Sequence, residues 1–435
     1  MKSKSVWTAE TKLPRFESLK GEVKTDVLII GGGLCGILCA YFLDKAGVDY
    51  VLVEGNRIGG GITKNTTGKI TVQHGLIYDK LIRKVGIEKA GQYLLANLWA
   101  LHEYERLCRG IDCDFEHKKA YTYTLTDPNN VEREAEAAVR LGYKAEFVEN
   151  LPLPFKTGGA VCFDRQAQFN PLKFIAAISR DLNIYENTFI RDIGRFFAIS
   201  ENGKIRAEKI ISATHFPFIN KHGSYFLKLY QNRSYVSAFK GAPNFDGMYI
   251  DQSGKGLSFR NYKNLLIVGG GAHRTGKKGG WEQLEMFREE YYPRSEISYR
   301  WAAQDCMSLD GIPYIGRYSK RTPDLYVASG FNKWGMTGSM AAAKILADMV
   351  MGRENEFAQV FSPHRSILKP QLLVNGFEAT VNLLTPTTKR CPHLGCALKW
   401  NKAEHTWDCP CHGSRFEPEG KLIDNPATGD ANVKA

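Results

Sequence analysis

A glycine-rich turn between an apolar strand and a helix constrains the fold of this chain more than any other stretch. Residues 25–44 run from four consecutive apolar side chains into Gly-Gly-Gly-Leu-Cys-Gly and then into a helix-like segment. Gly31 allows the tight turn, Gly33 lets the backbone approach a pyrophosphate, and Gly36 lets the helix lie close to the strand. A second apolar strand ends in Glu54, a carboxylate expected to bind a ribose hydroxyl pair. The pattern predicts a dinucleotide-binding βαβ unit, and a glycine-rich turn in an ordinary βαβ unit is the alternative.

The same layout returns late in the chain. An apolar strand over 325–328 is followed by a glycine turn at Gly330 and a helix-like segment that continues to Asp348. The N-terminus of such a helix presents N–H groups and a positive dipole to a ligand. Negative charge that develops on a reduced flavin would be stabilised there.

The loop over residues 55–68 is rich in glycine and threonine and follows the second strand directly. At the carboxyl end of a parallel strand, such a loop can offer backbone N–H and hydroxyl groups to a diphosphate or a flavin ring. A loop without a ligand is the alternative.

The size and composition indicate a globular protein with several domains. A chain of 435 residues is too long to fold around a single compact core, so two or three domains are expected. Hydrophobic residues make up 43% and charged residues 24%, which argues against large-scale disorder. The start of the chain is polar, and nowhere do 18 apolar residues run together. We therefore expect a soluble, cytoplasmic protein without a membrane span.

The formal net charge is +12, yet Lys and Arg are spread along the whole length. Nucleic-acid binding would require them to cluster with aromatic residues, so we expect no nucleic-acid partner. A basic surface can attract acidic proteins or anionic substrates, and a generic solvated surface is the alternative.

Four of the ten cysteines lie within 21 residues near the C-terminus, together with two histidines. Cys391 and His393 form C-x-H, and after a gap of 15 residues Cys409 and His412 form C-x-x-H. Two thiolates for one iron and two imidazoles for the other are what a Rieske [2Fe–2S] cluster requires. A tetrahedral zinc site with the same four ligands is the alternative.

The segment from about 24 to 352 resembles the D-amino-acid-oxidase-like flavoproteins, which include glycine and sarcosine oxidases. The resemblance rests on the glycine turn, Glu54, the Gly59-Gly60-Gly61 loop, the Ala213-Thr214 turn, and the segments at Asp310-Gly311 and Gly330. It implies an FAD-binding Rossmann-like domain with an inserted β-rich substrate domain over the flavin, a mixture of α/β and α+β architecture. The cofactor contacts that it implies are Gly31, Gly33, Gly36, Glu54, Arg57, Thr63, Thr66, Ala213, Gly330, Gly335, Met336 and Thr337.

Two positions depart from that family. His215 stands where the third residue of the turn is often Gly, and Asp305 stands where amine oxidases often carry Arg. β-like runs between 225 and 270 interrupt the βα pattern, as an inserted domain would. We expect a discontinuous FAD domain over 1–115, 165–222 and 300–352, a substrate domain over 116–164 and 223–299, and a small all-β iron–sulfur module over 353–435.

The C-terminal module resembles Rieske proteins of high potential, and this resemblance favours the cluster over zinc. It implies a disulfide between Cys396 and Cys411 that ties the two cluster loops, and a hydrogen bond from Ser414 to a bridging sulfide. Phe416 stands where respiratory members have Tyr, so one donor to a cysteine sulfur is missing. Hydrogen bonds to sulfur raise the potential, so we expect the lower or middle part of the range of about −150 to +300 mV. Residues 425–427 resemble the proline segment that covers the cluster.

The module is short, because about 35 residues separate the preceding helix from Cys391 and lack the usual alternating strands. The cluster loops are therefore expected to rest on the flavoprotein domain or on a partner subunit.

Both modules on one chain resemble bacterial and archaeal flavoproteins with a C-terminal Rieske centre. We expect FAD to exchange a hydride with a small amine, amino acid or hydroxy compound, and the cluster to relay single electrons to or from an acidic carrier such as a ferredoxin or flavodoxin. An oxidase that uses O₂ and a redox sensor without turnover are the alternatives. A homo-oligomer is compatible with the sequence.

Candidate catalytic residues come from short local patterns. Arg260 and Arg274 could clamp a carboxylate, although exposed arginines are the alternative. His74, His215 and His273 lie beside small-residue turns where a general base could act, and structural histidines are the alternative. Asp305, with Trp301 and Gln304, precedes a flavin-side segment and is expected to face the pocket, whereas Cys306 is not expected to attach flavin covalently.

Overall fold

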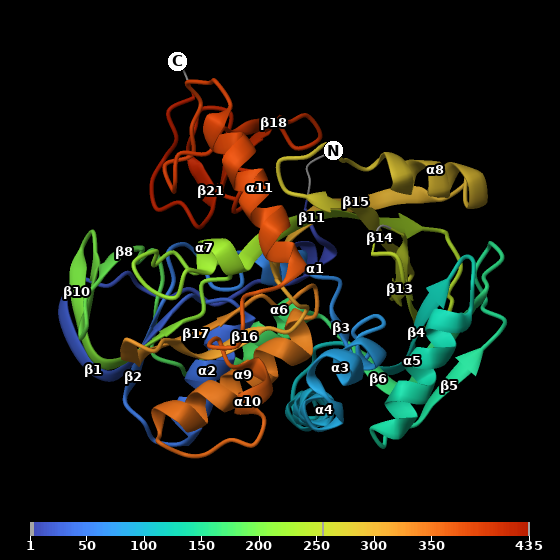
Figure 1. The fold of residues 1–435 in the computed structure, drawn as a ribbon, viewed down its shortest axis with the longest axis horizontal. Coiled ribbons are helices and arrows are strands. Elements are labelled where there is room, and N and C mark those ends of the chain that lie inside the picture. The colour runs from blue at the N-terminus through green and yellow to red at the C-terminus, as the bar shows by residue number, and fades with distance from the viewer. Residues whose placement is uncertain (1–3, 255, 434–435) are drawn as a thin grey trace.

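The computed structural model describes residues 4–254 and 256–433. Three sheets organise the chain, and Figure 1 shows the C-terminal module, in red, above the junction of the two larger ones.

The first sheet has a parallel centre in the order β17, β10, β1, β2, β7. The last four residues of β1 are all buried, because the α2 and α9 helices cover the sheet there. The strands are β1 (Gly21–Ile30), β2 (Tyr50–Val53), β7 (Ile184–Tyr185), β10 (Gly203–Ser212) and β17 (Thr322–Ser329), with β8 (Ile190–Ile193), β9 (Phe197–Ser200) and β16 (Tyr314–Ser319) added antiparallel.

The second sheet is mostly antiparallel and runs in the order β15, β11, β14, β13, β12, β4, β6, β3, with β5 beside β6. It is the β-rich region expected from the sequence. Its strands are β3 (Lys69–Ile70), β4 (Glu116–Thr124), β5 (Ala145–Val148), β6 (Gly159–Gln168), β11 (Leu229–Lys240), β12 (Met248–Asp251), β13 (Ser258–Tyr262), β14 (Leu265–Arg274) and β15 (Glu296–Ser308).

The longest helix of these two bodies, α4, packs against α9. Pro171 and the side-chain cap from Asn170 begin α6, as the sequence indicates. The helices are α1 (Val6–Glu10), α2 (Leu34–Lys45), α3 (Tyr78–Val85), α4 (Ile87–Cys108), α5 (Asn129–Arg140), α6 (Pro171–Ile178), α7 (Tyr225–Lys228), α8 (Glu282–Tyr291), α9 (Gly335–Val350), α10 (Ala358–Phe361) and the 3₁₀ turn η1 (Ile62–Asn65).

The C-terminal module consists of α11 (Pro370–Leu384) and a four-stranded sheet of β18 (Lys399–Asn401), β19 (Thr406–Asp408), β20 (Arg415–Phe416) and β21 (Leu422–Asp424). The two metal loops lie before β18 and between β19 and β20. In Figure 1 this module stands above α7 and β11.

Two of the expected boundaries are shifted by pairing and packing. β15 pairs with β11 over its whole length, so residue 300 falls inside a strand of the substrate sheet. The stretch after 353 begins on the flavoprotein body, because α10 packs on α4 and Arg365 pairs with Asp310. The iron–sulfur module proper therefore starts at α11.

Across residues 4–254 and 256–433, every helix is too short or too polar to cross a membrane.

Candidate active site and metal centre

The first glycine turn has the close approaches that a dinucleotide cradle needs. Gly31 adopts a φ of 111°, and a Cβ there would lie 2.6 Å from the carbonyl oxygen of Ala213. A Cβ on Gly36 would lie 1.9 Å from the carbonyl oxygen of Gly31, so α2 touches the turn directly. Gly33 is the N-cap of α2 in extended conformation and supplies no side-chain cap, so the N-terminus of the helix beyond the N–H of Leu34 is left for a ligand.

Glu54 lies at the carboxyl end of β2 and reaches back to this turn. Its Oε2 accepts a hydrogen bond from the backbone N–H of Gly32 at 2.7 Å, and Oε1 accepts one from Asn56 at 2.8 Å. Burial raises the pKa of Glu54, and these backbone donors oppose the shift. Arg57, also predicted to contact the cofactor, pairs with Glu186 and donates to the carbonyl of Pro14. Its guanidinium is therefore engaged by groups of the protein itself.

The glycine- and threonine-rich loop packs against the same turn. The hydroxyl of Thr63, in η1, accepts a hydrogen bond from the N–H of Leu34 at 3.1 Å, at the start of α2. The carbonyl of Thr66 accepts a hydrogen bond from the Trp7 indole at 2.7 Å. The loop is thus fixed beside the helix N-terminus that faces the cofactor.

The second glycine turn brings α9 to the cradle, and His74 fastens its first turn. His74 Nε2 lies 3.0 Å from the hydroxyl of Thr337, and Nδ1 lies 2.6 Å from the hydroxyl of Tyr93. The imidazole stacks on Trp334, and burial lowers the pKa of His74 to about 3, so the ring is neutral. His74 therefore positions the residues from Gly335 to Thr337 and has both ring nitrogens engaged.

The metal loops bring together the four predicted ligands. Cys391 and Cys409 are both buried, and their thiols are within hydrogen-bonding reach of each other. The Cys391 thiol and backbone N–H groups of the second loop hold the pKa of Cys409 below its ordinary value. The imidazole rings of His393 and His412 lie 4.9 Å apart, nearly perpendicular.

The outward nitrogens of both histidines are held by the flavoprotein domain. His393 Nε2 donates to the amide oxygen of Asn220 at 3.0 Å, and His412 Nε2 donates to the carbonyl of Phe226 at 3.0 Å. A carbonyl oxygen only accepts, so the proton sits on Nε2 and Nδ1 keeps its lone pair. Both Nδ1 atoms are buried, and neither has a hydrogen-bond partner among the described residues.

Burial lowers the pKa of His393 to about 4 and that of His412 to about 3, so both rings are neutral. Two paired thiols and two free, neutral Nδ1 atoms are the donor set of a Rieske [2Fe–2S] cluster. The residues present therefore fit the group.

The two loops are tied as the family resemblance implies. Cys396 and Cys411 form a disulfide, with their Cα atoms 6.6 Å apart. The sulfur of Cys409 lies within 4.8 Å of both disulfide sulfurs. The hydroxyl of Ser414 accepts a hydrogen bond from the N–H of Ala427 at 2.9 Å, which fastens the proline segment over the second loop.

The support of this short module comes from the flavoprotein domain. Arg274 donates to the carbonyls of Pro410 and Cys411 and to Asn375 of α11. Gln304 donates to the carbonyl of Gly413 at 2.8 Å. The expected exposure of Arg274 is wrong, because its guanidinium fastens the second metal loop.

A buried ionic network adds to this docking. Arg233 of β11 pairs with Glu404 of the module, and Arg415 bridges Glu404 and Asp408. Burial opposes ionisation of Glu404, but the two guanidinium groups outweigh it and hold its pKa below the ordinary value. The sequence carries no local signal that Arg233 joins this network, because Arg233 lies 171 residues from Glu404.

One short turn connects the cofactor cradle with the metal loops. Ala213 donates its N–H to the carbonyl of Ile30, and its own carbonyl abuts Gly31. Three residues later, the ring of Phe216 lies 6.4 Å from that of His393 and 6.0 Å from that of His412. His215 between them has a φ of 66°, the left-handed conformation that Gly adopts at the least cost.

The chain matches the family "FAD dependent oxidoreductase" over residues 26–349 and the "Rieske [2Fe-2S] domain" over residues 377–434. It belongs to the FAD-dependent oxidoreductases. It is an enzyme of that family that binds FAD and carries a Rieske [2Fe–2S] domain.

The whole architecture recurs in a relative named putative Rieske 2Fe-2S iron-sulfur protein YhfW, from Bacillus subtilis, at 34% identity over 97% of this chain and 95% of the relative. Glycine oxidase from Geobacillus kaustophilus shares the fold with a TM-score of 0.67 and 19% identity, over 79% of this chain and all of that one. L-proline dehydrogenase from P. horikoshii does so with a TM-score of 0.68 and 17% identity, over 79% of this chain and 98% of that one.

Three ionisable groups lie at the turn before α9. Asp305 of β15 interacts electrostatically with Lys333 and with His215. Burial raises the pKa of Asp305 and lowers the pKa values of Lys333 and His215. The Lys333 residue as a whole is exposed, and its pKa is lowered because protein atoms packed near its ammonium group displace water. Its backbone has a φ of 74°. Sequence reasoning missed Lys333, although a cation inside a glycine-flanked turn is a readable signal.

The other candidates have structural partners. Arg260 is fully buried and donates to the carbonyls of Thr67 and Gly68, so the expectation that it is exposed is wrong. His273 stacks on Tyr235 and its Nδ1 lies 2.9 Å from the carbonyl of Gly271. Cys306 is buried against the hydroxyl of Ser329, and burial raises its pKa to about 12.

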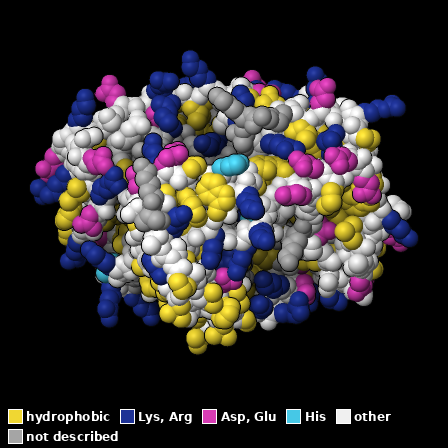
Figure 2. Space-filling view, turned by 90° about the horizontal axis from the view of Figure 1, so that it is seen from above, with side chains coloured by type: hydrophobic (Ala, Val, Ile, Leu, Met, Phe, Trp, Pro, Cys, Tyr) yellow, Lys and Arg dark blue, Asp and Glu magenta, His cyan; other side chains and the backbone are white. Residues whose placement is uncertain are grey.

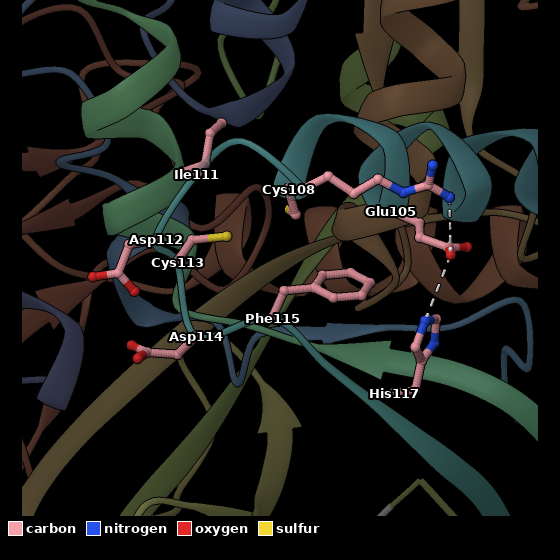
Figure 3. A pocket seen from close by; sticks show the side chains of 9 residues that line it. Glu105, Cys108, Ile111, Asp112, Cys113, Asp114, Phe115 and His117 are labelled. Carbon is pink, nitrogen blue, oxygen red and sulfur yellow. Dashed lines mark hydrogen bonds and ion pairs between the residues drawn. The ribbon is translucent and has the colours of Figure 1, made fainter.

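A surface pocket of about 410 Å³ lies between the end of α4 and the start of β4 (Figure 3). Its Glu105 pairs with Arg109 and His117, and Cys108 and Cys113 line it. The residues that line it are distinct from every predicted cofactor and cluster contact.

Proposed function

We propose that this oxidoreductase oxidises a small organic substrate at FAD and passes the electrons singly through its own cluster to an external carrier. The turn from Ala213 to Phe216 carries the proposal, because one end abuts the glycine cradle and the other contacts both cluster histidines. Three residues span at most about 11 Å. The path along this turn, from the glycine cradle to the cluster histidines, is therefore short.

FAD, when bound, takes electrons from an organic substrate in pairs, whereas a [2Fe–2S] cluster exchanges them one at a time. The chain's own residues prepare both steps. The N-terminus of α9, held by His74, directs its dipole toward developing negative charge. Gln231 links the two centres, because its Oε1 lies 3.1 Å from His215 Nε2 while its amide donates to the carbonyl of His412.

The substrate class follows from the groups near the turn before α9. The accessible Lys333 would bind a carboxylate, and Asp305 would bind an ammonium group. His215, whose pKa is lowered by burial, would accept a proton as a neutral base. The names of the structural neighbours include glycine and L-proline, so amino acids are the first class to test. Amines and hydroxy compounds follow.

The test is anaerobic rapid mixing of the holoenzyme with amino acids, amines and hydroxy acids. Flavin bleaching by one of them, followed by the spectrum of the reduced cluster, would support the proposal. Flavin that is reduced by substrate and never reduces the cluster would contradict it. Lys333→Met should raise KM for a carboxylate substrate more than it lowers kcat, with Lys320→Met as a surface control.

For the external carrier, we propose an acidic protein such as a ferredoxin or flavodoxin, because the chain carries a net charge of +12. The rate of its reduction should fall as salt rises. Stoichiometric O₂ consumption, with the cluster left oxidised, would favour an oxidase instead.

A further inference from the structure

The α11 helix is inverted relative to an ordinary surface helix. Its buried residues are Asn375 and Asn382, at 5% and 3% exposure. Leu373, Phe377 and Leu384 are 78%, 69% and 76% exposed. A surface helix normally buries its apolar stripe and exposes the polar one. Further apolar side chains exposed on or beside this helix are Leu368, Val374, Val381 and Leu383.

Polar contacts hold the helix in this orientation. Asn375 accepts a hydrogen bond from Arg274 at 2.9 Å and donates to the carbonyl of Leu227 at 3.3 Å. The carbonyl of Asn382 accepts the N–H of Ala397 at 2.9 Å. Rolling the helix to bury its leucines would break these bonds and detach the metal loops, so the apolar side faces outward as part of the fold.

The exposed apolar side continues to the first metal loop. A Cβ at Gly395 would lie 3.9 Å from Leu383. Leu394, which follows the ligand His393, is 40% exposed. Exposed apolar side chains gathered along one helix and the loop beside it mark an interaction site.

The charged residues that flank this helix in the sequence are positive, and the one acid on the helix is paired. The helix has a single charged residue, Glu378, which is 15% exposed and pairs with Lys277 at 2.8 Å. Lys369 precedes the helix, and Lys389 and Arg390 follow it. Figure 2 views this side of the molecule and shows apolar side chains at its lower edge with Lys and Arg beside them.

We propose that α11 docks this chain on an anionic lipid surface, with its apolar side in the boundary between headgroups and acyl chains. An apolar helix face bordered by cations, with its one carboxylate held in an ion pair, is a composition that binds such surfaces. A second copy of this chain is the less favoured partner. Each copy carries a formal net charge of +12, and the repulsion between two such copies opposes their pairing through this face. Docking in this way brings the loop of His393 to the membrane surface. This membrane-docking proposal does not depend on which substrate the flavin site oxidises.

The experiment is flotation of the full-length holoprotein with two kinds of vesicle, phosphatidylcholine alone and phosphatidylcholine with phosphatidylglycerol. Binding is expected to the second kind and should weaken at high salt. The double variant Leu373→Ser/Phe377→Ser should partition roughly a hundredfold more weakly. The matched control is Val139→Ser/Met286→Ser, which removes two side chains of 56% and 62% exposure from other helices and should bind like the wild type.

The cluster absorbance and the unfolding temperature of each variant confirm that it is folded. Absence of binding to the anionic vesicles, or equal binding by the double variant and the wild type, would overturn the proposal. So would a dimer in sedimentation velocity that the double variant abolishes, since a second copy would then be the occupant.

Discussion

The ring of Phe216 meets that of His412 edge to face, with 6.0 Å between their centroids. Phe216 is fully buried and belongs to the flavoprotein domain, while His412 belongs to the second metal loop. The cofactor cradle and the cluster are thereby joined through a segment of the chain that ligates neither.

Phe216→Leu should slow electron transfer from reduced flavin to the cluster and leave flavin binding unchanged. The smaller side chain opens space beside both histidines and costs about 1–2 kcal/mol of stability. The measurement is flash photoreduction of the flavin with the cluster followed by absorbance and by EPR. Phe218→Leu, in the same segment, is the control, and equal transfer rates in the two variants would argue against the relay through Phe216.

Gly31→Ala should abolish tight FAD binding. The added Cβ would lie 2.6 Å from the carbonyl of Ala213, and the left-handed backbone at φ 111° adds about 1–2 kcal/mol. Fluorescence titration of the apoprotein with FAD measures the loss. Gly91→Ala is the matched control, because Gly91 lies inside α4, away from the glycine turns, and has open space around its Cβ position. Similar FAD affinities of the two variants would show that Gly31 does not contribute to the FAD site.

Glu404→Gln should loosen the module and make the stability of the chain less dependent on pH. Removing one partner of a buried pair costs about 3–5 kcal/mol. The folded pKa of Glu404 lies below its unfolded value of about 4.3, so its ionic bonds stabilise the fold above that pH and are lost as pH falls through the folded value.

Thermal unfolding should therefore separate Glu404→Gln from the wild type at pH 7, with the difference shrinking below about pH 4. The exposed Glu417→Gln serves as the control. A constant difference across the whole pH range would contradict an ionic role for Glu404.

The double variant Cys396→Ser/Cys411→Ser should lose its cluster faster on heating. A disulfide that closes a loop of 15 residues contributes about 3 kcal/mol. The decay of the cluster absorbance at a fixed temperature measures the effect. A free-cysteine variant such as Cys162→Ser is the control, and identical decay in all three proteins would show that the disulfide is dispensable.

Phe416→Tyr should raise the reduction potential of the cluster. The ring is fully buried in β20, and a new hydroxyl there would donate to a cysteine sulfur. One net hydrogen bond of about 0.5–1.5 kcal/mol shifts a one-electron couple by about 20–65 mV. An EPR-monitored titration measures both midpoints, with Phe416→Leu as control. A wild-type midpoint near the upper limit of about +300 mV would contradict the low-to-middle range expected from Phe416.

The cofactors and the order of the modules could be predicted from the sequence, because their signals are local. Gly31 and Gly36 sit within one turn and one helix, and Cys391, His393, Cys409 and His412 sit within two short loops. Backbone conformation and ligand chemistry at such spacings leave few other solutions.

The roles of the arginines and of Phe216 became visible in the folded chain alone. Arg260 and Arg274 have the same local character in the sequence, yet one fastens a loop in the core and the other fastens the metal loop. The β15 strand, which carries Asp305, belongs to the second sheet because it pairs with β11. These contacts connect segments that lie dozens to nearly two hundred residues apart in the sequence. The packing of whole sheets selects which side chains meet, and a short sequence pattern does not contain that information.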